Sequence, residues 1–252
     1  MKPQVVVYPS PEALSRDAAE RFQRLAGQSI ASTGRFSVAL SGGSTPLLLY
    51  RLLSEPPFRE AIDWARVHLF WGDERFVPPS HRDNNYRAAR EALISRVPIP
   101  TENVHPIPTE ATDPETAAAQ YEDALRRFFA APEGESPRFD LVLLGLGSEG
   151  HTASLFPGSP ALDEHKRLVV ATYVPKLAAW RITLTPPVLR GARQVIFLVA
   201  GTDKATVLRD VLEGPYDPQK LPAQLVQRDQ GDLTWLADEA AADLLSAGLK
   251  GR

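Results

Sequence analysis

The chain has 252 residues, of which 43% are hydrophobic and 23% charged, and its net charge is −3. This composition is typical of a globular protein with a sizeable core. There is no basic excess, which argues against nucleic acid as a partner. No apolar run approaches the roughly 18 residues of a membrane span. The chain has no cysteine, which excludes disulfides, thiolate nucleophiles and cysteine metal sites.

The N-terminal residues 1–8 lack the long apolar core and the small-residue cleavage site of a signal peptide. Together with the absence of cysteine, this predicts a cytoplasmic protein. The length fits one large domain or two small ones, and we expect a single domain over residues 1–252. Two proline-rich stretches, Pro98–Thr112 and Pro132–Pro137, are predicted to be connections inside that domain.

Short apolar segments alternate with longer amphipathic segments along the chain. Strands are predicted over Val5–Tyr8, Phe36–Leu40, Val67–Trp71, Leu141–Leu144, Leu168–Val174, Ile182–Thr185, Val195–Ala200 and Leu233–Leu236. Helices are predicted over Pro11–Ala31, Pro46–Leu53, Asn84–Ser95, Asp113–Ala130, Ala205–Leu212 and Asp238–Leu249. Near-continuous apolar strands between helices indicate a parallel sheet that is covered on both faces. We therefore expect an α/β fold with a Rossmann-like, mostly parallel sheet, helices on both faces, and a small antiparallel addition around residues 168–185.

Four of the predicted strands end in polar residues, and the first such end follows Phe36–Leu40. Its residues are Ser41, Gly42, Gly43, Ser44, Thr45 and Pro46. Ser44 or Thr45 is predicted to be the N-cap of a helix that begins at Pro46. A helix N-terminus exposes unpaired N–H groups and suits a phosphate, although neither the Walker spacing nor the GxGxxG spacing is present. A well-capped helix without a ligand explains this turn equally well.

The second polar strand end follows Val67–Trp71, where Gly72 leads into Asp73, Glu74 and Arg75. If the chain stays extended, Asp73 and Arg75 point to one side and Glu74 to the other. A carboxylate beside a guanidinium stays ionised and can hold a sugar hydroxyl or orient a base. The alternative is a surface ion pair of little energetic consequence.

The third polar strand end is a glycine-rich turn that carries His151. Gly145, Gly147 and Gly150 precede this histidine. Glycine lets the backbone approach a ligand closely, and an imidazole takes and gives protons near neutral pH. Ligands bind at the carboxyl ends of the strands in open α/β sheets. His151 is therefore a candidate catalytic base, with helix capping as the alternative.

The fourth polar strand end begins at Gly201. Thr202 or Asp203 is predicted to cap a helix whose first turn contains Lys204. The helix dipole opposes a cation there by about 0.3–1 kcal/mol, and a bound anion would offset this cost. Lys204 is therefore a candidate phosphate ligand, and Arg181 adds a second cation with bidentate geometry. A solvated lysine is the alternative.

Three segments together resemble the 6-phosphogluconolactonases, which share a superfamily with the glucosamine-6-phosphate isomerases. The segments are Ser41–Pro46, Trp71–Pro78 and Gly145–Gly158, and the resemblance extends over roughly the whole chain. The isomerases carry a glutamate, which supports their ring-opening histidine, where this chain has Phe156. An apolar side chain cannot hold or relay a proton, so Phe156 disfavours the isomerase activity.

The resemblance implies hydrolysis of the δ-lactone of 6-phosphogluconate in the oxidative pentose phosphate pathway, without a cofactor or a metal. His151 is then the general base, with Asp73 and Glu149 as further catalytic residues. Glu149 stands where the family usually has an aspartate, which is one methylene shorter. The predicted substrate-binding residues are Ser41, Gly42, Gly43, Ser44, Thr45, Arg75, Arg181 and Lys204.

The remaining polar residues that we considered are predicted to be structural. Asp83–Asn85 resembles a family segment and is expected mainly to cap a helix. Four further histidines show no metal-ligand spacing and are expected to be structural or exposed. They are His68, His81, His105 and His165.

Two other functions stay open at this point. One is a glucosamine-6-phosphate isomerase that releases ammonia, and the other is a non-catalytic sensor of sugar phosphates. The partner predicted in each case is a small phosphosugar, with no nucleic acid and no membrane. We expect a monomer, because the lactonases that the chain resembles are often monomeric.

Overall fold

The structure, a computed structural model, describes residues 4–132, 135–226 and 232–249. Its centre is a six-stranded sheet in the order β1-β9-β8-β5-β2-β3, in which every neighbouring pair of strands is parallel. The strands are β1 (Gln4–Tyr8), β2 (Phe36–Leu40), β3 (Val67–Trp71), β5 (Leu141–Gly145), β8 (Gln194–Val199) and β9 (Asp232–Asp238). All five residues of β2 are buried, as expected of a central strand. The predicted parallel sheet is confirmed.

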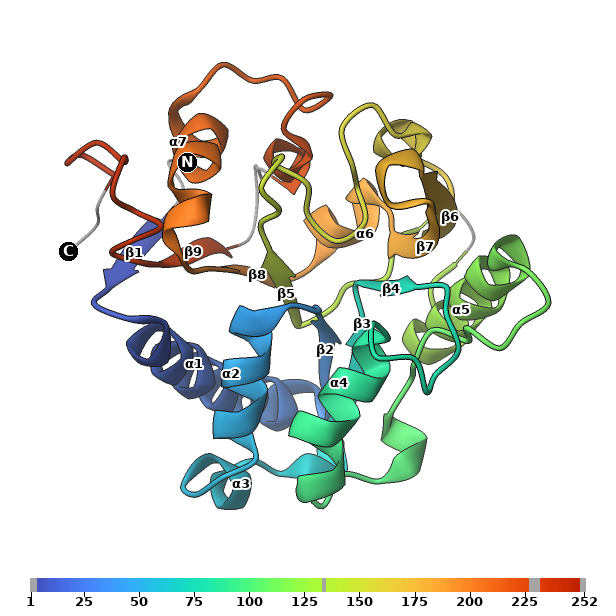
Figure 1. The fold of residues 1–252 in the computed structure, drawn as a ribbon. Coiled ribbons are helices and arrows are strands. Elements are labelled where there is room, and N and C mark those ends of the chain that lie inside the picture. Colours follow the sequence, from blue (N-terminus) through green and yellow to red (C-terminus); the bar gives the residue numbers. More distant parts are fainter. Residues whose placement is uncertain (1–3, 133–134, 227–231, 250–252) are drawn as a thin grey trace.

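Helices cover both faces of this sheet. In Figure 1, α1 (Pro11–Thr33) and α2 (Ser44–Leu53) lie on one side of it and α7 (Ala205–Glu213) lies on the other. The remaining helices are α3 (Phe58–Ala61), α4 (Asn85–Ala92), α5 (Pro114–Phe129) and α6 (Pro186–Gly191). Helix α1 buries apolar side chains spaced three or four residues apart, which are Leu14, Ala18, Phe22 and Leu25. Within the described ranges, no helix has the length and apolar character needed to cross a membrane.

A second sheet of three antiparallel strands adjoins the first. Its order is β4-β7-β6, with β4 (Asp73–Arg75), β6 (Val169–Val174) and β7 (Ala179–Leu184). Gly72 joins the two sheets, because its N–H donates to the Leu40 carbonyl at 2.8 Å and its carbonyl accepts from the Leu184 N–H at 2.9 Å. The predicted antiparallel addition is confirmed, and β4 is a third strand that the sequence analysis did not assign to it.

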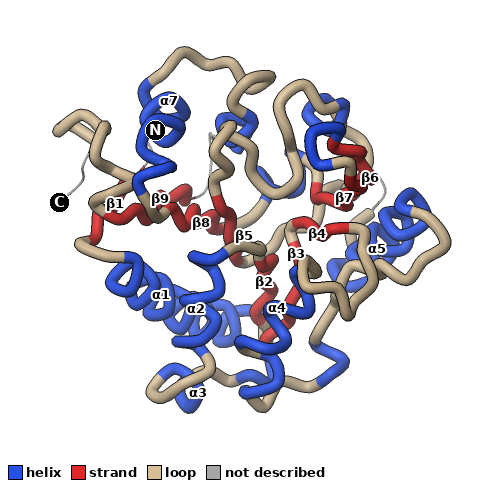
Figure 2. The backbone as a smooth tube through the Cα atoms, viewed as in Figure 1, coloured by secondary structure: helices blue, strands red, loops and turns tan. Residues whose placement is uncertain are grey.

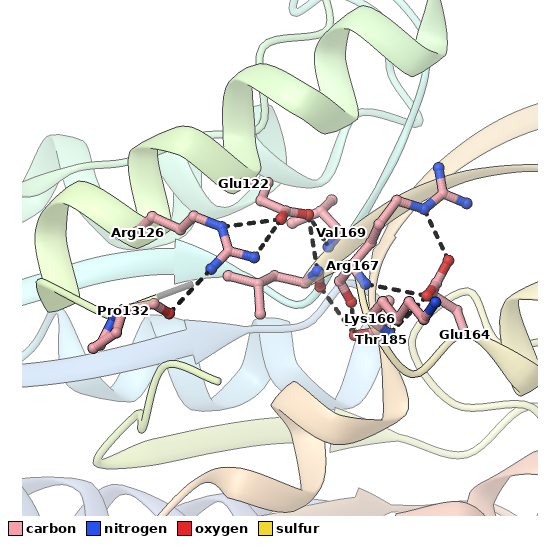
Figure 3. Close-up of polar contacts among 9 residues, drawn as sticks. Glu122, Arg126, Pro132, Glu164, Lys166, Arg167, Val169 and Thr185 are labelled. Carbon is pink, nitrogen blue, oxygen red and sulfur yellow. Dashed lines mark hydrogen bonds and ion pairs between the residues drawn. The ribbon is translucent and has the colours of Figure 1, made fainter. Parts of the chain in front are cut away.

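Glu122 on α5 fastens the outer strand of the second sheet, as Figure 3 shows. One oxygen of its carboxylate accepts the N–H groups of Leu168 and Val169 at 2.8 and 3.2 Å. The other oxygen accepts from Arg126, one helical turn away, at 3.1 and 2.7 Å. The Glu122 side chain is only 16% exposed, so these bonds are largely shielded from water. Helix α5 and strand β6 are thereby tied together at the point where the strand begins.

Replacing Glu122 by alanine is expected to destabilise the protein by about 1–3 kcal/mol, because two backbone N–H groups lose a charged acceptor. Urea unfolding followed by circular dichroism measures this change. Asp123→Ala, at the exposed neighbouring position, is the matched control and should leave the free energy of unfolding nearly unchanged. An equal effect of the two substitutions would show that Glu122 does not fasten the strand.

The chain after β9 differs from the prediction, because the helix expected over Asp238–Leu249 is absent. The described residues 239–249 form turns instead. The carboxylate of Asp238 accepts the N–H of Ala241 at 2.7 Å and that of Gly201 at 3.1 Å. An aspartate side chain that bonds to nearby backbone groups offers an alternative to a helix. The alanine-rich pattern indicated a helix, but the contact with Gly201 could not be read from it.

His68 on β3 and His105 form a stacked pair, with Nδ1 of the first 3.4 Å from Nε2 of the second. Both rings pack against Phe128, and His105 stacks on Phe70 at 4.3 Å. Burial lowers the pKa of both histidines. The pKa of His105 falls to about 4. The charge of Arg35 further lowers the pKa of His68. Both imidazoles are therefore neutral at pH 7, and their contacts agree with the structural role predicted for them.

Candidate active site

A cavity of about 570 Å³ lies at the carboxyl ends of β2, β5 and β8. The strands β2 and β5 are neighbours, yet the chain leaves them in opposite directions, toward β3 and toward β8. Such a reversal opens a crevice where open α/β sheets bind ligands. Figure 2 shows the loop that follows β5 at this edge of the sheet. Every predicted site residue except Glu149 lines the cavity, namely Ser41, Gly42, Gly43, Ser44, Thr45, Asp73, Arg75, His151, Arg181 and Lys204.

A tyrosine holds the turn between β2 and α2. The Tyr50 hydroxyl donates to the Ser41 carbonyl at 2.7 Å and accepts the Ser41 N–H at 3.0 Å. Burial raises the pKa of Tyr50, so the hydroxyl keeps its proton. Gly43, with a φ of 107°, is the N-cap of α2, and the helix begins at Ser44 without a side-chain cap. The prediction that Ser44 or Thr45 is the N-cap is therefore wrong, and both residues line the cavity instead.

Strand β4 shows the alternation that its sequence predicted. Asp73 and Arg75 line the cavity, whereas Glu74 lies outside it and is 1% exposed. The Glu74 carboxylate accepts the backbone N–H groups of Arg75, Asn85 and Tyr86 at 2.7–2.8 Å. Burial raises the pKa of Glu74 to about 7. These bonds attach the beginning of α4 to β4 and fix one wall of the cavity.

The carboxylate of Asp73 is held by a buried hydroxyl. Ser154 Oγ donates to Asp73 Oδ2 at 2.6 Å, and the Ser154 N–H donates to Thr183 Oγ1 at 3.2 Å. Thr183 is in turn the partner of Asp73 in the ladder between β4 and β7. All three residues are buried. The sequence analysis missed the bond between Ser154 and Asp73, because 81 positions separate the two residues.

Two arginines face each other across the ladder between β4 and β7. Arg75 and Arg181 are directly paired, and both line the cavity. Arg75 Nη1 donates to the Asp83 carbonyl at 2.6 Å, whereas the buried Nε of Arg181 has no hydrogen-bond partner among the described residues. Burial and the charge of Arg75 lower the pKa of Arg181. Like charges placed directly opposite each other destabilise a sheet, and a bound anion would remove this repulsion.

His151 enters the cavity from the glycine-rich turn after β5. Its ring stacks on Phe156, with centroids 4.2 Å apart and an angle of 24° between the planes. The ring also lies against Gly147, where a Cβ would be 2.0 Å from His151 Cε1 and Nδ1. Gly150 adopts a φ of 81°, which lets the chain turn just before the histidine. Burial lowers the pKa of His151, although Glu149 and Asp73 oppose this shift.

Glu149 lies behind the imidazole, outside the cavity lining. Its Oε2 is 3.3 Å from His151 Nδ1, and its Oε1 is 3.3 Å from Lys176 Nζ. The Glu149 side chain is 28% exposed. Burial acts to raise the pKa of Glu149, but a hydrogen bond to its own backbone, the charge of His151 and the bond from Lys176 lower it, so the group is ionised at neutral pH. Nδ1 is buried beside this carboxylate and makes no hydrogen bond among the described residues, so Nε2 is the ring nitrogen that is left for a ligand.

Lys204 lies at the end of a short 3-10 turn, Thr202–Lys204, that leads into α7. Its Nζ is 2.9 Å from Asp203 Oδ2, and its side chain is 23% exposed. Lys204 itself stands at the N-cap position of α7, and the helix has no side-chain cap. The prediction that Thr202 or Asp203 caps a helix with Lys204 in its first turn is therefore wrong. Lys204 nevertheless lines the cavity.

The capping role predicted for Asp83–Asn85 holds for one residue only. Asn84 is the N-cap of α4, and its Oδ1 accepts the Arg87 N–H at 2.8 Å. Asn85 does not cap the helix; it is 5% exposed and lines the cavity. Its Nδ2 donates to the Asp73 carbonyl at 3.1 Å. The sequence carries no signal that separates the two asparagines, because both positions suit the start of a helix.

The fold is that of an enzyme class that acts on sugar phosphates. The chain belongs to the glucosamine-6-phosphate isomerases/6-phosphogluconolactonase family, whose model matches residues 9–235. It is 44% identical over 245 residues to a 6-phosphogluconolactonase of Synechocystis sp., which covers 97% of this chain and 99% of the relative. A 6-phosphogluconolactonase of Nostoc sp. is 42% identical over 246 residues, which covers 98% and 100%. The resemblance seen in the sequence is thereby confirmed.

Solved structures of the family have the same fold. The 6-phosphogluconolactonase of Trypanosoma cruzi superposes with a TM-score of 0.88 at 34% identity, covering 98% of each chain. The enzyme of Trypanosoma brucei gives a TM-score of 0.84 at 33% identity, covering 97% of this chain and 99% of that one. A monomeric glucosamine-6-phosphate deaminase also matches, with a TM-score of 0.78, but at 22% identity this is a likeness of fold alone.

Proposed function

We propose that this cavity hydrolyses the δ-lactone of 6-phosphogluconate to the open acid, the lactonase step of the oxidative pentose phosphate pathway, with His151 as the general base. The observation that carries the proposal is a single imidazole with a lowered pKa in a cavity that three cations line. An imidazole of this kind is neutral near pH 7 and is able to accept a proton. The two relatives with 44% and 42% identity carry the name of this enzyme.

The chemical step begins with Nε2 of neutral His151. It takes a proton from a water molecule while the water oxygen bonds to the lactone carbonyl carbon, and the carbonyl electron pair moves onto its oxygen. When the tetrahedral intermediate collapses, the bond from carbon to the ring oxygen breaks. The ring oxygen keeps that electron pair and takes the proton back from the imidazolium. A lactone is an activated ester, so this route needs no covalent nucleophile, no metal and no cofactor.

The other side chains are assigned to binding and orientation. Glu149 orients the ring and stabilises the imidazolium through Nδ1. Asp73 and Arg75 hold sugar hydroxyls or the carbonyl. The developing oxyanion is held by backbone N–H groups of the turn at Gly42–Gly43 or of the turn at Gly145–Gly147.

The phosphate is assigned to the cationic end of the cavity. We place it against the turn Ser41–Thr45, within reach of Arg181 and Lys204. The Ser41 hydroxyl is buried and has no partner among the described residues, so it is free to donate to the phosphate. Action as a monomer stays part of the proposal. A cytoplasmic location also stays part of the proposal.

The contact between His151 and Phe156 disfavours the isomerase activity. An aromatic ring is stacked on the imidazole at the position where the isomerases carry their glutamate. The direct test incubates the protein separately with freshly made 6-phosphogluconolactone and with glucosamine 6-phosphate. We expect acid release from the lactone well above the spontaneous rate and no ammonia from the amino sugar. Ammonia release without excess hydrolysis would overturn the proposal in favour of the isomerase.

A further inference from the structure

We propose that Asn85 is a further substrate-contacting residue, whose side-chain amide binds a ring hydroxyl of the lactone and so contributes to specificity. This inference rests on the proposed function, because it names the part of the lactone that this residue recognises. It concerns a residue that the sequence had indicated only as part of a helix cap.

Asn85 is held rigidly at the junction of two cavity walls. Its backbone N–H donates to Glu74 Oε1 at 2.7 Å, and its Nδ2 donates to the Asp73 carbonyl at 3.1 Å. The residue is 5% exposed, and what remains accessible lies at the cavity, because Asn85 belongs to the cavity lining. A side chain fixed in this way reaches a ligand with little loss of conformational entropy.

The amide oxygen of Asn85 is left without a protein donor. No described residue donates to Oδ1, although Nδ2 of the same amide is bonded. Gly42 makes room for this oxygen, because a Cβ at Gly42 would lie 2.0 Å from Asn85 Oδ1. Next to Gly42, Ser41 is 6% exposed, and its buried hydroxyl has no partner among the described residues. Two unused polar groups therefore border the same part of the cavity, and buried polar groups normally have partners.

The chemistry of the cavity indicates which ligand group the amide oxygen takes. The lining is rich in donors, such as Arg75, Arg181 and Lys204, and these suit phosphate and carbonyl oxygens. An amide oxygen only accepts hydrogen bonds, so a fully ionised phosphate offers it nothing. A sugar hydroxyl both donates and accepts, and it needs an acceptor of this kind. Asn85 Oδ1 therefore fits a ring hydroxyl and does not fit the phosphate.

The experiment compares four phosphorylated lactones with the wild-type protein and with Asn85→Ala. One is the parent 6-phosphogluconolactone, and the others lack the hydroxyl at C2, at C3 or at C4. We expect Asn85→Ala to lower kcat/KM by about tenfold or more for the parent and for two of the deoxy lactones. For the third, which lacks the hydroxyl that Asn85 binds, the substitution should change kcat/KM less than about twofold.

Asn84→Ala is the matched control, because Asn84 caps the same helix without lining the cavity. It should lower the stability by about 1 kcal/mol and leave kcat/KM unchanged for all four lactones. If Asn85→Ala does not fold, Asn85→Ser replaces it, since the serine side chain is polar but too short to keep an acceptor oxygen in the same place. That variant should show the same pattern of losses as Asn85→Ala.

Two results would overturn the inference. One is an equal loss for all four lactones in Asn85→Ala, which would make the role of Asn85 structural. The other is the absence of any loss of kcat/KM in Asn85→Ala or in Asn85→Ser. Failure of the proposed function itself would give a different result. The wild-type protein would then hydrolyse the parent lactone no faster than the lactone hydrolyses spontaneously in water.

Discussion

Replacing His151 by alanine is expected to lower kcat for 6-phosphogluconolactone by about 10²–10⁴-fold and to leave KM nearly unchanged. The substitution removes the base that activates water and the acid that protonates the ring oxygen. It leaves Arg75, Arg181 and Lys204 in place, so the phosphorylated substrate still binds. The rate must be measured on fresh lactone with spontaneous hydrolysis subtracted, because lactones open unaided in water.

His165→Ala is the control for this experiment, because His165 is exposed and does not line the cavity. It should retain full activity. The experiment also distinguishes an enzyme from a sensor of sugar phosphates. A sensor would bind the phosphosugar, but even the wild-type protein would show no turnover. Full activity in His151→Ala would mean that another group acts as the base.

The second large effect is expected for Arg181→Met, which should raise KM for the phosphorylated lactone by about 10- to 100-fold. The side chain of Arg181 is half-buried, its buried Nε has no partner among the described residues, and Arg75 lies directly opposite. We therefore expect Arg181 to bind the phosphate with a strong charge-assisted hydrogen bond. Methionine keeps much of the side-chain length and removes the charge.

Unphosphorylated glucono-1,5-lactone is the control substrate for Arg181→Met. If Arg181 binds the phosphate, the substitution should change kcat/KM little for this lactone. The thermal midpoint without substrate should not fall, because the repulsion between Arg75 and Arg181 disappears. Arg190→Met, at an exposed position, controls for the loss of a positive charge. An equal loss for both lactones would contradict the phosphate assignment.

The parallel sheet and most of the cavity could be predicted because buried parallel strands are continuous apolar runs. Phe36–Leu40 and Val67–Trp71 were expected with the bounds that β2 and β3 have in the structure. Once such strands are known to be parallel, the polar residues after them must meet at one edge of the sheet. This rule predicted that Asp73, His151 and Lys204 lie at one site, although the sequence gives no distances between them.

The features that sequence analysis missed depend on contacts between distant segments. The bond between Ser154 and Asp73 joins the turn after His151 to strand β4, and the absence of a helix after Asp238 reflects a contact with Gly201. Asn85 was interpreted as a cap because the segment is a good helix start, and only the packing against Gly42 places it at the cavity. Local patterns determine elements and strand ends, whereas tertiary contacts decide which side chains share a cavity.

The pH dependence of kcat/KM for the lactone tests the central claim most directly. The pKa of His151 lies below the usual imidazole value of 6.5, so the base is neutral above that pKa and protonated below it. We predict activity that stays high near neutral pH and falls on the acid side through a single pKa below 6.5. The acid limb should be absent from the residual activity of His151→Ala. A limb that persists in that variant, or a flat profile in the wild-type protein, would contradict the assignment of His151 as the base.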